Sequence, residues 1–266
     1  MQHVVRLAQK RPLLVFFLLA FGLAWLFFLP VVIPIQNIPP EFIVVPTFAP
    51  TVAAVITHWL ANRDLRAFAA TRFTSRLLLT AFAGPVLIAI AFAIIPAFLL
   101  GAGPPARWRW AVFTSVTVIN WSTILGGPLG EEPGWRGYAL PRLEALFGPI
   151  WASAVLGLLW ALWHAPLFLI PGWASVSPAN FARILVGVSF LMTFVARLSH
   201  SYVLIPILMH AAFNTSSKWL DGLLEPVGWQ QNMSPGLILA LCWLPVAVVL
   251  AFLDFRASRR RPHLGT

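Results

Sequence analysis

Charged side chains are scarce in this sequence: Lys, Arg, Asp and Glu make up 10% of its 266 residues, whereas hydrophobic residues make up 59%. A soluble domain of ordinary composition carries about 25% charged residues, so the composition excludes that class. Uncharged stretches recur along the chain, and a helix of about 20 such residues crosses a bilayer. The sequence therefore predicts an all-α integral membrane protein, a polytopic bundle of about eight transmembrane helices.

Cysteine is almost absent, since Cys242 is the only one and lies inside an apolar stretch. An intrachain disulfide and a metal site built from several cysteines are therefore excluded. Acidic residues are also few, 8 against 18 Lys and Arg, which gives a net charge of +10. The basic residues lie mostly at the edges of apolar stretches, so we interpret them as orientation signals and not as a nucleic-acid surface.

Eight apolar segments are expected to cross the membrane. They are 13–35, 42–61, 77–100, a fourth that begins near Ala111 and enters the region of Glu131, then 150–170, 181–198, 201–216 and 236–255. With both termini in the cytosol, most Lys and Arg residues fall on the cytosolic side, as the positive-inside rule requires. We see no internal repeat and no soluble domain, so we expect residues 1–266 to form one integral membrane domain, in the plasma (inner) membrane.

Three charged side chains interrupt this apolar pattern within a short stretch: Glu131, Glu132 and Arg136. A charge near the bilayer centre costs about 2.5 to 3.5 kcal/mol on insertion scales, so a functional site is the default interpretation. Glu132 and Arg136 are four residues apart, share one helix face and are expected to form an ion pair that stiffens the motif. Glu131 is turned about 100° away from Glu132. The two glutamates are therefore expected to have different roles.

Two later helices carry His164 and the pair His210 and Asn214. The members of that pair are four residues apart and so share a helix face. At a rise of about 1.5 Å per residue, both histidines lie within roughly 5 Å of the depth of Glu131, provided that the fourth helix continues through the motif. We therefore expect one polar cavity within the membrane. The alternatives are a surface loop for the glutamates and, for either histidine alone, a hydrogen bond between helices.

These residues resemble the motifs of the CAAX protease and bacteriocin-processing intramembrane proteases (Abi, or CPBP), which include the type II CAAX prenyl endopeptidases. The family pattern is Glu-Glu-x-x-x-Arg, then Phe-x-x-x-His, then His-x-x-x-Asn or Asp. The matching residues here are Glu131, Glu132, Arg136, Trp160, His164, His210 and Asn214, within the region 123–216. Trp160 departs from the usual Phe, and we expect it to keep an aromatic wall without touching the polar groups.

The resemblance implies an intramembrane endopeptidase, a helical bundle with a conical active-site cavity open toward the cytosol and the lipid. Glu131 would be the general base that activates water, and His164 would help to hold it. His210 and Asn214 would stabilise the oxyanion of the tetrahedral intermediate. The implied substrate is a membrane-associated protein or peptide, of which prenylated CAAX-type proteins are the best-known class.

The sequence leaves more than one possibility open for the cofactor and for the class of function. Glu131, His164 and His210 could hold a zinc ion, and the family is often described as metalloproteases. The chain lacks His-Glu-x-x-His, however, and the resemblance also fits a metal-free glutamate mechanism, which we favour. A non-catalytic membrane immunity or scaffold protein that binds a peptide in the same cavity is one alternative function, and a proton-coupled transporter is another. The expected partners are the substrate and the lipid bilayer, with no nucleic acid.

Overall fold

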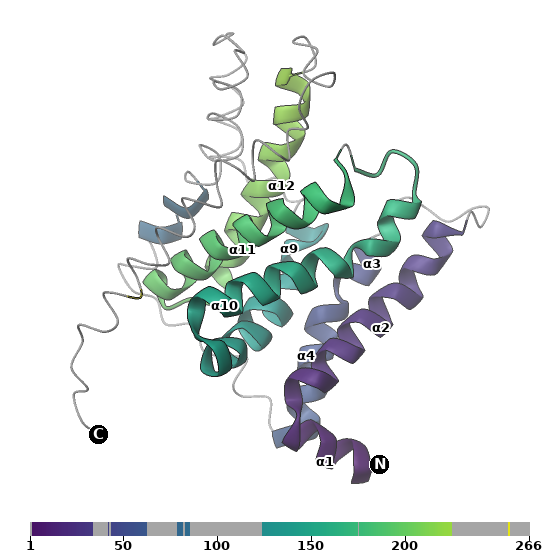
Figure 1. Cartoon of the computed structure of the whole chain (residues 1–266), viewed down its shortest axis with the longest axis vertical. Coiled ribbons are helices and arrows are strands. Elements are labelled where there is room, and N and C mark those ends of the chain that lie inside the picture. The colour runs from purple at the N-terminus through teal and green to yellow at the C-terminus, as the bar shows by residue number, and fades with distance from the viewer. Residues whose placement is uncertain are drawn as a thin grey trace.

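The computed structural model describes residues 2–33, 42, 44–62, 79–81, 83–85, 124–174, 176–224 and 255, with the backbone alone for 217–224. Every regular element within these residues is a helix, and Figure 1 shows the helices packed as a bundle. The predicted all-α class is therefore confirmed.

Four helical stretches in the described part of the chain are long and apolar enough to cross a membrane: Pro12–Val32, Val44–Asn62, Pro128–Trp163 and Pro178–Ser199. They coincide with the predicted first and second segments, with parts of the fourth and fifth, and with the sixth. The predicted third and eighth segments lie almost wholly outside the described residues, as does the start of the fourth. The total of about eight segments stays a prediction.

The N-terminal helices form one side of the bundle. α1 (Gln2–Lys10) leads into α2 (Pro12–Val32), which begins with a proline, a residue well suited to the first helical turn. After the short helix α3 (Val44–Thr47), α4 (Ala49–Asn62) packs along α2. Both helices bury alanines, which allow membrane helices to approach closely. These alanines are Ala20, Ala24, Ala53 and Ala54.

The motif lies in a continuous helical stretch that starts with α9 (Pro128–Glu132), passes through the π-helix η4 (Pro133–Ala139) and continues as α10 (Leu140–Trp163). Pro133 has no N–H and so cannot donate an ordinary helical hydrogen bond at that point. Short π-helical segments are frequent at functional sites. Both glutamates lie in this helical stretch and are buried. They therefore do not form the surface loop that was the alternative interpretation.

Gly148 divides the long stretch into two helices. Its φ of 75° and ψ of 168° interrupt α10, and glycine adopts a positive φ without the steric cost that a side chain brings. Pro149 follows and starts the second helical part, consistent with the preference of proline for a first helical turn. The break lies between the predicted fourth and fifth segments.

The second half of the bundle contains α11 (Pro178–Ser199), which runs side by side with α10 (Figure 1). The hydroxyl of Ser177 caps α11 by accepting the N–H of Asn180. α12 (Leu204–Leu224) packs against α9 and α11. The motif helix is thus enclosed between the N-terminal helices and the C-terminal pair.

Two predicted boundaries are wrong. The fifth segment does not run as an α-helix to Ile170, since α10 ends at Trp163 and the 3-10 helix η5 (Ala165–Leu169) follows. A residue before proline disfavours the α conformation, and Ala165 precedes a proline. The seventh segment does not end at Ser216, because α12 continues to Leu224. The hydroxyl of Thr215 donates to the carbonyl of Ala211 within the same helix, so this polar residue does not mark a helix end.

Buried aromatic rings hold the motif helix against α2. Trp135 meets Phe16 edge to face at a centroid distance of 5.5 Å and meets Trp163 at 6.1 Å. On the α4 side, the hydroxyl of Thr51 donates to the carbonyl of Gly130 at 2.6 Å. These contacts come from helices on both sides of the motif. They fix the position of α9 and therefore of its two glutamates.

Candidate active site

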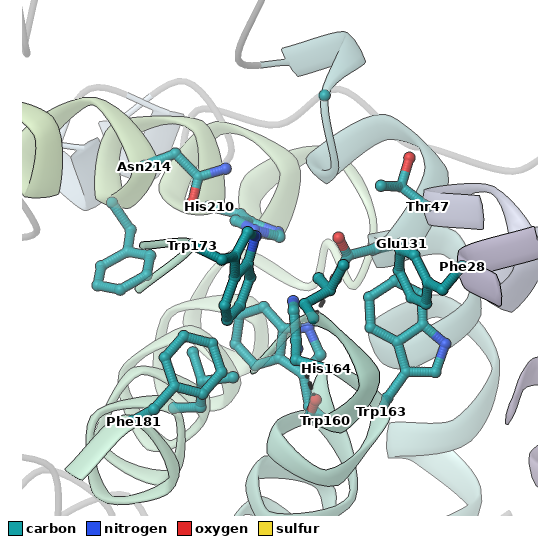
Figure 2. Close-up of a pocket in the computed structure, with 14 residues that line it drawn as sticks. Phe28, Thr47, Glu131, Trp160, Trp163, His164, Trp173, Phe181, His210 and Asn214 are labelled. Carbon is teal, nitrogen blue, oxygen red and sulfur yellow. Dashed lines mark hydrogen bonds between the residues drawn. The ribbon is translucent and has the colours of Figure 1, made fainter. Parts of the chain in front are cut away.

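A cavity of about 300 Å³ lies beside the motif helix, lined by residues of α2, α3, α9, α10, η5, α11 and α12. The residues predicted as catalytic all line it: Glu131, His164, His210 and Asn214. Figure 2 shows their side chains around one opening. Side chains that are up to 83 residues apart in the sequence therefore come together at one place.

Glu131 is almost completely buried, with 3% of its surface exposed. Its Oε2 accepts the indole N–H of Trp160 at 2.6 Å. Its Oε1 faces Gly127, because a Cβ atom placed on that glycine would lie 3.0 Å from Oε1. The same Cβ would lie 3.8 Å from Asn214 Nδ2 and 3.8 Å from His210 Cε1. Gly127 thus packs closely against these polar groups, and a side chain there would crowd Oε1 of Glu131.

Glu132 has two partners. Its Oε1 lies 3.0 Å from Nη1 of Arg136 and 2.7 Å from Nδ1 of His210. The predicted pair of Glu132 and Arg136 is therefore present, and both side chains are fully buried. Because a carboxylate accepts hydrogen bonds, Nδ1 of His210 carries the proton in this contact, and Nε2 is the ring nitrogen left for other partners.

Arg136 is buried with only part of its hydrogen-bonding capacity used. Its guanidinium carbon lies 4.2 Å from the ring centroid of Trp160, a cation–π arrangement. Within the described residues, Nε and Nη2 have no hydrogen-bond partner. The ion pair with Glu132 and the ring of Trp160 are thus the contacts that compensate this buried charge.

His164 follows the last residue of α10, and the end of that helix is tied to α2. Trp163 donates its indole N–H to the carbonyl of Ala20 at 3.2 Å, and Trp25 donates to the carbonyl of Trp163 at 3.0 Å. Nδ1 of His164 lies 2.8 Å from the carbonyl oxygen of Trp160. A carbonyl only accepts, so Nδ1 carries the proton, and Nε2 of a neutral ring is free to accept one.

Aromatic side chains form the remainder of the cavity wall. Trp173 stacks on the His164 ring at a centroid distance of 5.9 Å, and Phe181 meets the same ring edge to face at 5.2 Å. Phe28, Trp163 and Phe213 line the cavity as well. Figure 2 shows Trp173 and Phe181 on one side of the opening, with Phe28 and Trp163 on the other. The polar groups therefore lie in a largely apolar enclosure, which is typical of small-molecule and peptide sites.

The expectation that Trp160 does not touch the polar groups is wrong. Besides its bond to Glu131 and its contact with Arg136, its ring meets the His210 ring edge to face at 5.0 Å. The physical reason is that tryptophan, unlike phenylalanine, carries an N–H donor, which normally finds a partner when buried. The sequence could have indicated this contact, because a tryptophan in an apolar helix brings an N–H group that needs an acceptor. Gly127 gave no comparable signal, because its role depends on the backbone conformation.

The predicted metal ligands do not fit a shared ion in this arrangement. Within the part of the chain that the structure describes, no three His, Cys, Asp or Glu side chains are grouped so that they could hold a metal. Nδ1 of each histidine is bonded to an oxygen acceptor. Metal-bound histidines commonly make the same bond, so the placement of the three side chains, and not these bonds, is what gives no shared site among the described residues. We therefore derive no step through zinc.

Comparison with known proteins identifies the same region. The type II CAAX prenyl endopeptidase Rce1-like family matches residues 110–216. The CAAX prenyl protease 2 of Methanococcus maripaludis is 26% identical over 101 residues, which are 34% of this chain and 36% of that relative. The match thus spans about a third of the relative's length. Over residues 110–216 the chain therefore carries the pattern of the CAAX protease and bacteriocin-processing family, and the resemblance predicted from its three motifs is confirmed.

Proposed function

We propose that this protein is an intramembrane endopeptidase that uses Glu131 to activate water. The observation that carries the proposal is the convergence of one buried carboxylate, two histidines and an amide on a single aromatic-lined cavity. The similarity to a family of prenyl endopeptidases supports the same reaction class. Peptide hydrolysis needs a base, a water molecule and donors for the oxyanion, and the cavity offers a side chain for each task.

The first step is attack of water on the peptide carbonyl. Glu131 lines the cavity, and a water molecule in the cavity would lose a proton to its Oε1 as the water oxygen attacks the carbonyl carbon. Nε2 of His164 would accept a hydrogen bond from the same water, because Nδ1 is bonded to the carbonyl of Trp160. Orienting the water in this way lowers the entropic part of the barrier.

The second step is stabilisation and collapse of the tetrahedral intermediate. Asn214 would donate from its amide, and His210 would donate from Nε2 when its ring carries a proton on both nitrogens. Glu132 would then balance the ring charge through its contact with Nδ1. Glu131 returns the proton to the departing amide nitrogen, the C–N bond breaks, and the products are a carboxylic acid and an amine.

The proposed substrate is a membrane-associated protein or peptide with an apolar group near the cleaved bond. Rings of Phe28, Trp163, Trp173 and Phe181 line the cavity and would bury such a group favourably. A prenylated CAAX-type protein meets this description, and the relative's name refers to such a substrate. We further propose that the protein resides in the plasma (inner) membrane with both termini in the cytosol, as the distribution of Lys and Arg suggests.

The test is cleavage by purified protein in detergent or nanodiscs, with wild type and Glu131→Gln compared on the same panel. The panel contains a farnesylated CAAX peptide, the same peptide without the lipid, and an unrelated transmembrane peptide, and mass spectrometry identifies the products. We expect cleavage by wild type and at least a hundredfold lower rate in Glu131→Gln, since one essential base is removed.

Controls separate the proposal from its alternatives. Thermal midpoints must show that Glu131→Gln is folded. Saturable peptide binding without any cleavage by wild type would support the non-catalytic immunity or scaffold alternative. Proton-coupled uptake of a solute into proteoliposomes, without cleavage, would support the transporter alternative. Equal cleavage by wild type and Glu131→Gln would remove Glu131 from the mechanism.

A further inference from the structure

Trp160 contacts four residues of the polar site. Its indole N–H donates to Glu131, its ring lies beneath the guanidinium of Arg136, and its ring edge meets His210. Its carbonyl oxygen accepts from Nδ1 of His164. The side chain is 1% exposed, so water does not compete for these contacts.

The hydrogen bond from the indole fixes one of the two oxygens of Glu131. Among the described residues, no other side chain donates to this carboxylate. A carboxylate held at one oxygen can rotate little, so Oε1 keeps its position beside Gly127 in the wall of the cavity. A donor to a charged acceptor in a buried place is among the stronger hydrogen bonds, and 2.6 Å is short.

We propose that Trp160 is a positioning residue for Glu131: it holds Oε2 through its N–H and so directs Oε1 toward the water in the cavity. The inference rests on the proposed function, because it assumes that Glu131 is the base. Phenylalanine, the residue that the family pattern has at this position, supplies the ring without the N–H. In this chain the donor is therefore a separate property of the site and is open to its own test.

The decisive variant replaces Trp160 by benzothienylalanine, in which a sulfur atom stands where the indole has its N–H. Size and aromatic character are kept, so the contacts with Arg136 and His210 persist while the donor is lost. We expect kcat to fall about ten- to hundredfold, with KM changed less than about threefold, because the base is misdirected but substrate contacts remain. Trp160→Phe should show a similar fall in kcat, with an added loss of thermal midpoint from the smaller ring.

Trp135 provides the matched control. It is also fully buried, and its indole nitrogen has no partner within the described residues. Benzothienylalanine at Trp135 should leave kcat and the thermal midpoint close to wild type, because a donor without a partner contributes no hydrogen bond.

A spectroscopic measurement tests the bond without any need for activity. The indole ¹H–¹⁵N resonance of Trp160 is identified as the one that disappears in Trp160→Phe, and it should move clearly in Glu131→Gln because the charged acceptor becomes a neutral amide. An unchanged resonance in Glu131→Gln, or full kcat in the benzothienylalanine protein, would overturn the inference. Loss of activity in Glu131→Gln with full activity of the benzothienylalanine variant would overturn this inference alone and leave the proposed function standing.

Discussion

Oε1 of Glu132 lies 2.7 Å from Nδ1 of His210, a contact between α9 and α12 that joins residues 78 positions apart. The same oxygen pairs with Arg136. The sequence predicts a mainly structural role for Glu132 through its arginine partner. The contact with His210 gives Glu132 a second role, in the site itself: because Nδ1 of His210 is bonded to Glu132, Nε2 is the ring nitrogen left to act in the cavity.

The first prediction concerns Glu132→Gln. We expect a lower thermal midpoint and a kcat at least about tenfold lower, because the variant removes the charge that balances both Arg136 and His210. Enzyme kinetics and thermal unfolding in the same detergent measure the two effects. A lowered midpoint with unchanged kcat would mean that the contact with His210 does not matter for turnover.

Glu144→Gln is the matched control for Glu132→Gln. Glu144 also has a basic partner, Arg197 at 3.2 Å, and it accepts from the hydroxyl of Tyr202 at 3.1 Å. This group is partly exposed, and Glu144 does not line the cavity. An ion pair near solvent contributes little to stability. The variant should keep the wild-type kcat and lose less of its thermal midpoint than Glu132→Gln.

The second prediction concerns Arg136→Ala. Its side chain is fully buried beside Glu132, and removal of one partner of a buried ion pair costs about 3 to 5 kcal/mol. We expect a large fall in thermal midpoint together with a loss of activity. The double variant Arg136→Met with Glu132→Met should recover part of the midpoint, since apolar residues of similar size can replace a buried pair. A wild-type midpoint with lost turnover in Arg136→Ala would assign the arginine to binding or chemistry.

The third prediction concerns metal dependence. Within the described residues, Glu131, His164 and His210 are not grouped so that they could share a metal ion, so we expect the purified protein to hold less than stoichiometric zinc and to keep its activity in a strong chelator. Elemental analysis and assays before and after chelation measure this. Stoichiometric zinc, with activity lost on chelation and restored by added metal, would contradict the metal-free mechanism.

The sequence was sufficient to predict the helical class, the pairing of Glu132 with Arg136 and the location of Glu131, His164, His210 and Asn214 at one cavity. The first and last of these follow from rules with a fixed period: about 20 apolar residues per membrane span, and about 1.5 Å of rise per residue in a helix. The pair follows from four-residue spacing. Such rules depend only on the spacing of residues within one helix, and this spacing can be read from the sequence.

Contacts between helices could not be predicted in the same way. The bond from Trp160 to Glu131 joins α10 to α9, and the bond from Glu132 to His210 joins α9 to α12. Both depend on helix rotation and on side-chain rotamers, which the packing of neighbouring helices determines. The boundary errors near Ile170 and Ser216 have local causes. Pro166 follows the early end of α10, and the hydroxyl of Thr215 bonds to a carbonyl within α12, so that helix continues.

The last prediction concerns Gly127, whose φ of 154° and ψ of −69° are a conformation that side chains disfavour. A Cβ atom there would lie 3.0 Å from Oε1 of Glu131 and would push against the oxygen that is proposed to take the proton from water. Gly127→Ala should therefore lower kcat at least about a hundredfold, in addition to a loss of stability on the order of 1 to 3 kcal/mol from backbone strain. Kinetics and thermal unfolding of the same preparation separate the two effects.

Gly148→Ala is the control for this prediction. Gly148 also has a positive φ, 75°, but a Cβ atom there would meet nothing within 4 Å. Its substitution should cost a similar amount of stability through backbone strain and leave kcat near wild type. If both variants lose stability and activity in the same proportion, strain alone explains Gly127→Ala, and the close approach of Gly127 to Glu131 has no role in turnover. If only Gly127→Ala loses turnover, the missing side chain at that position is part of the site.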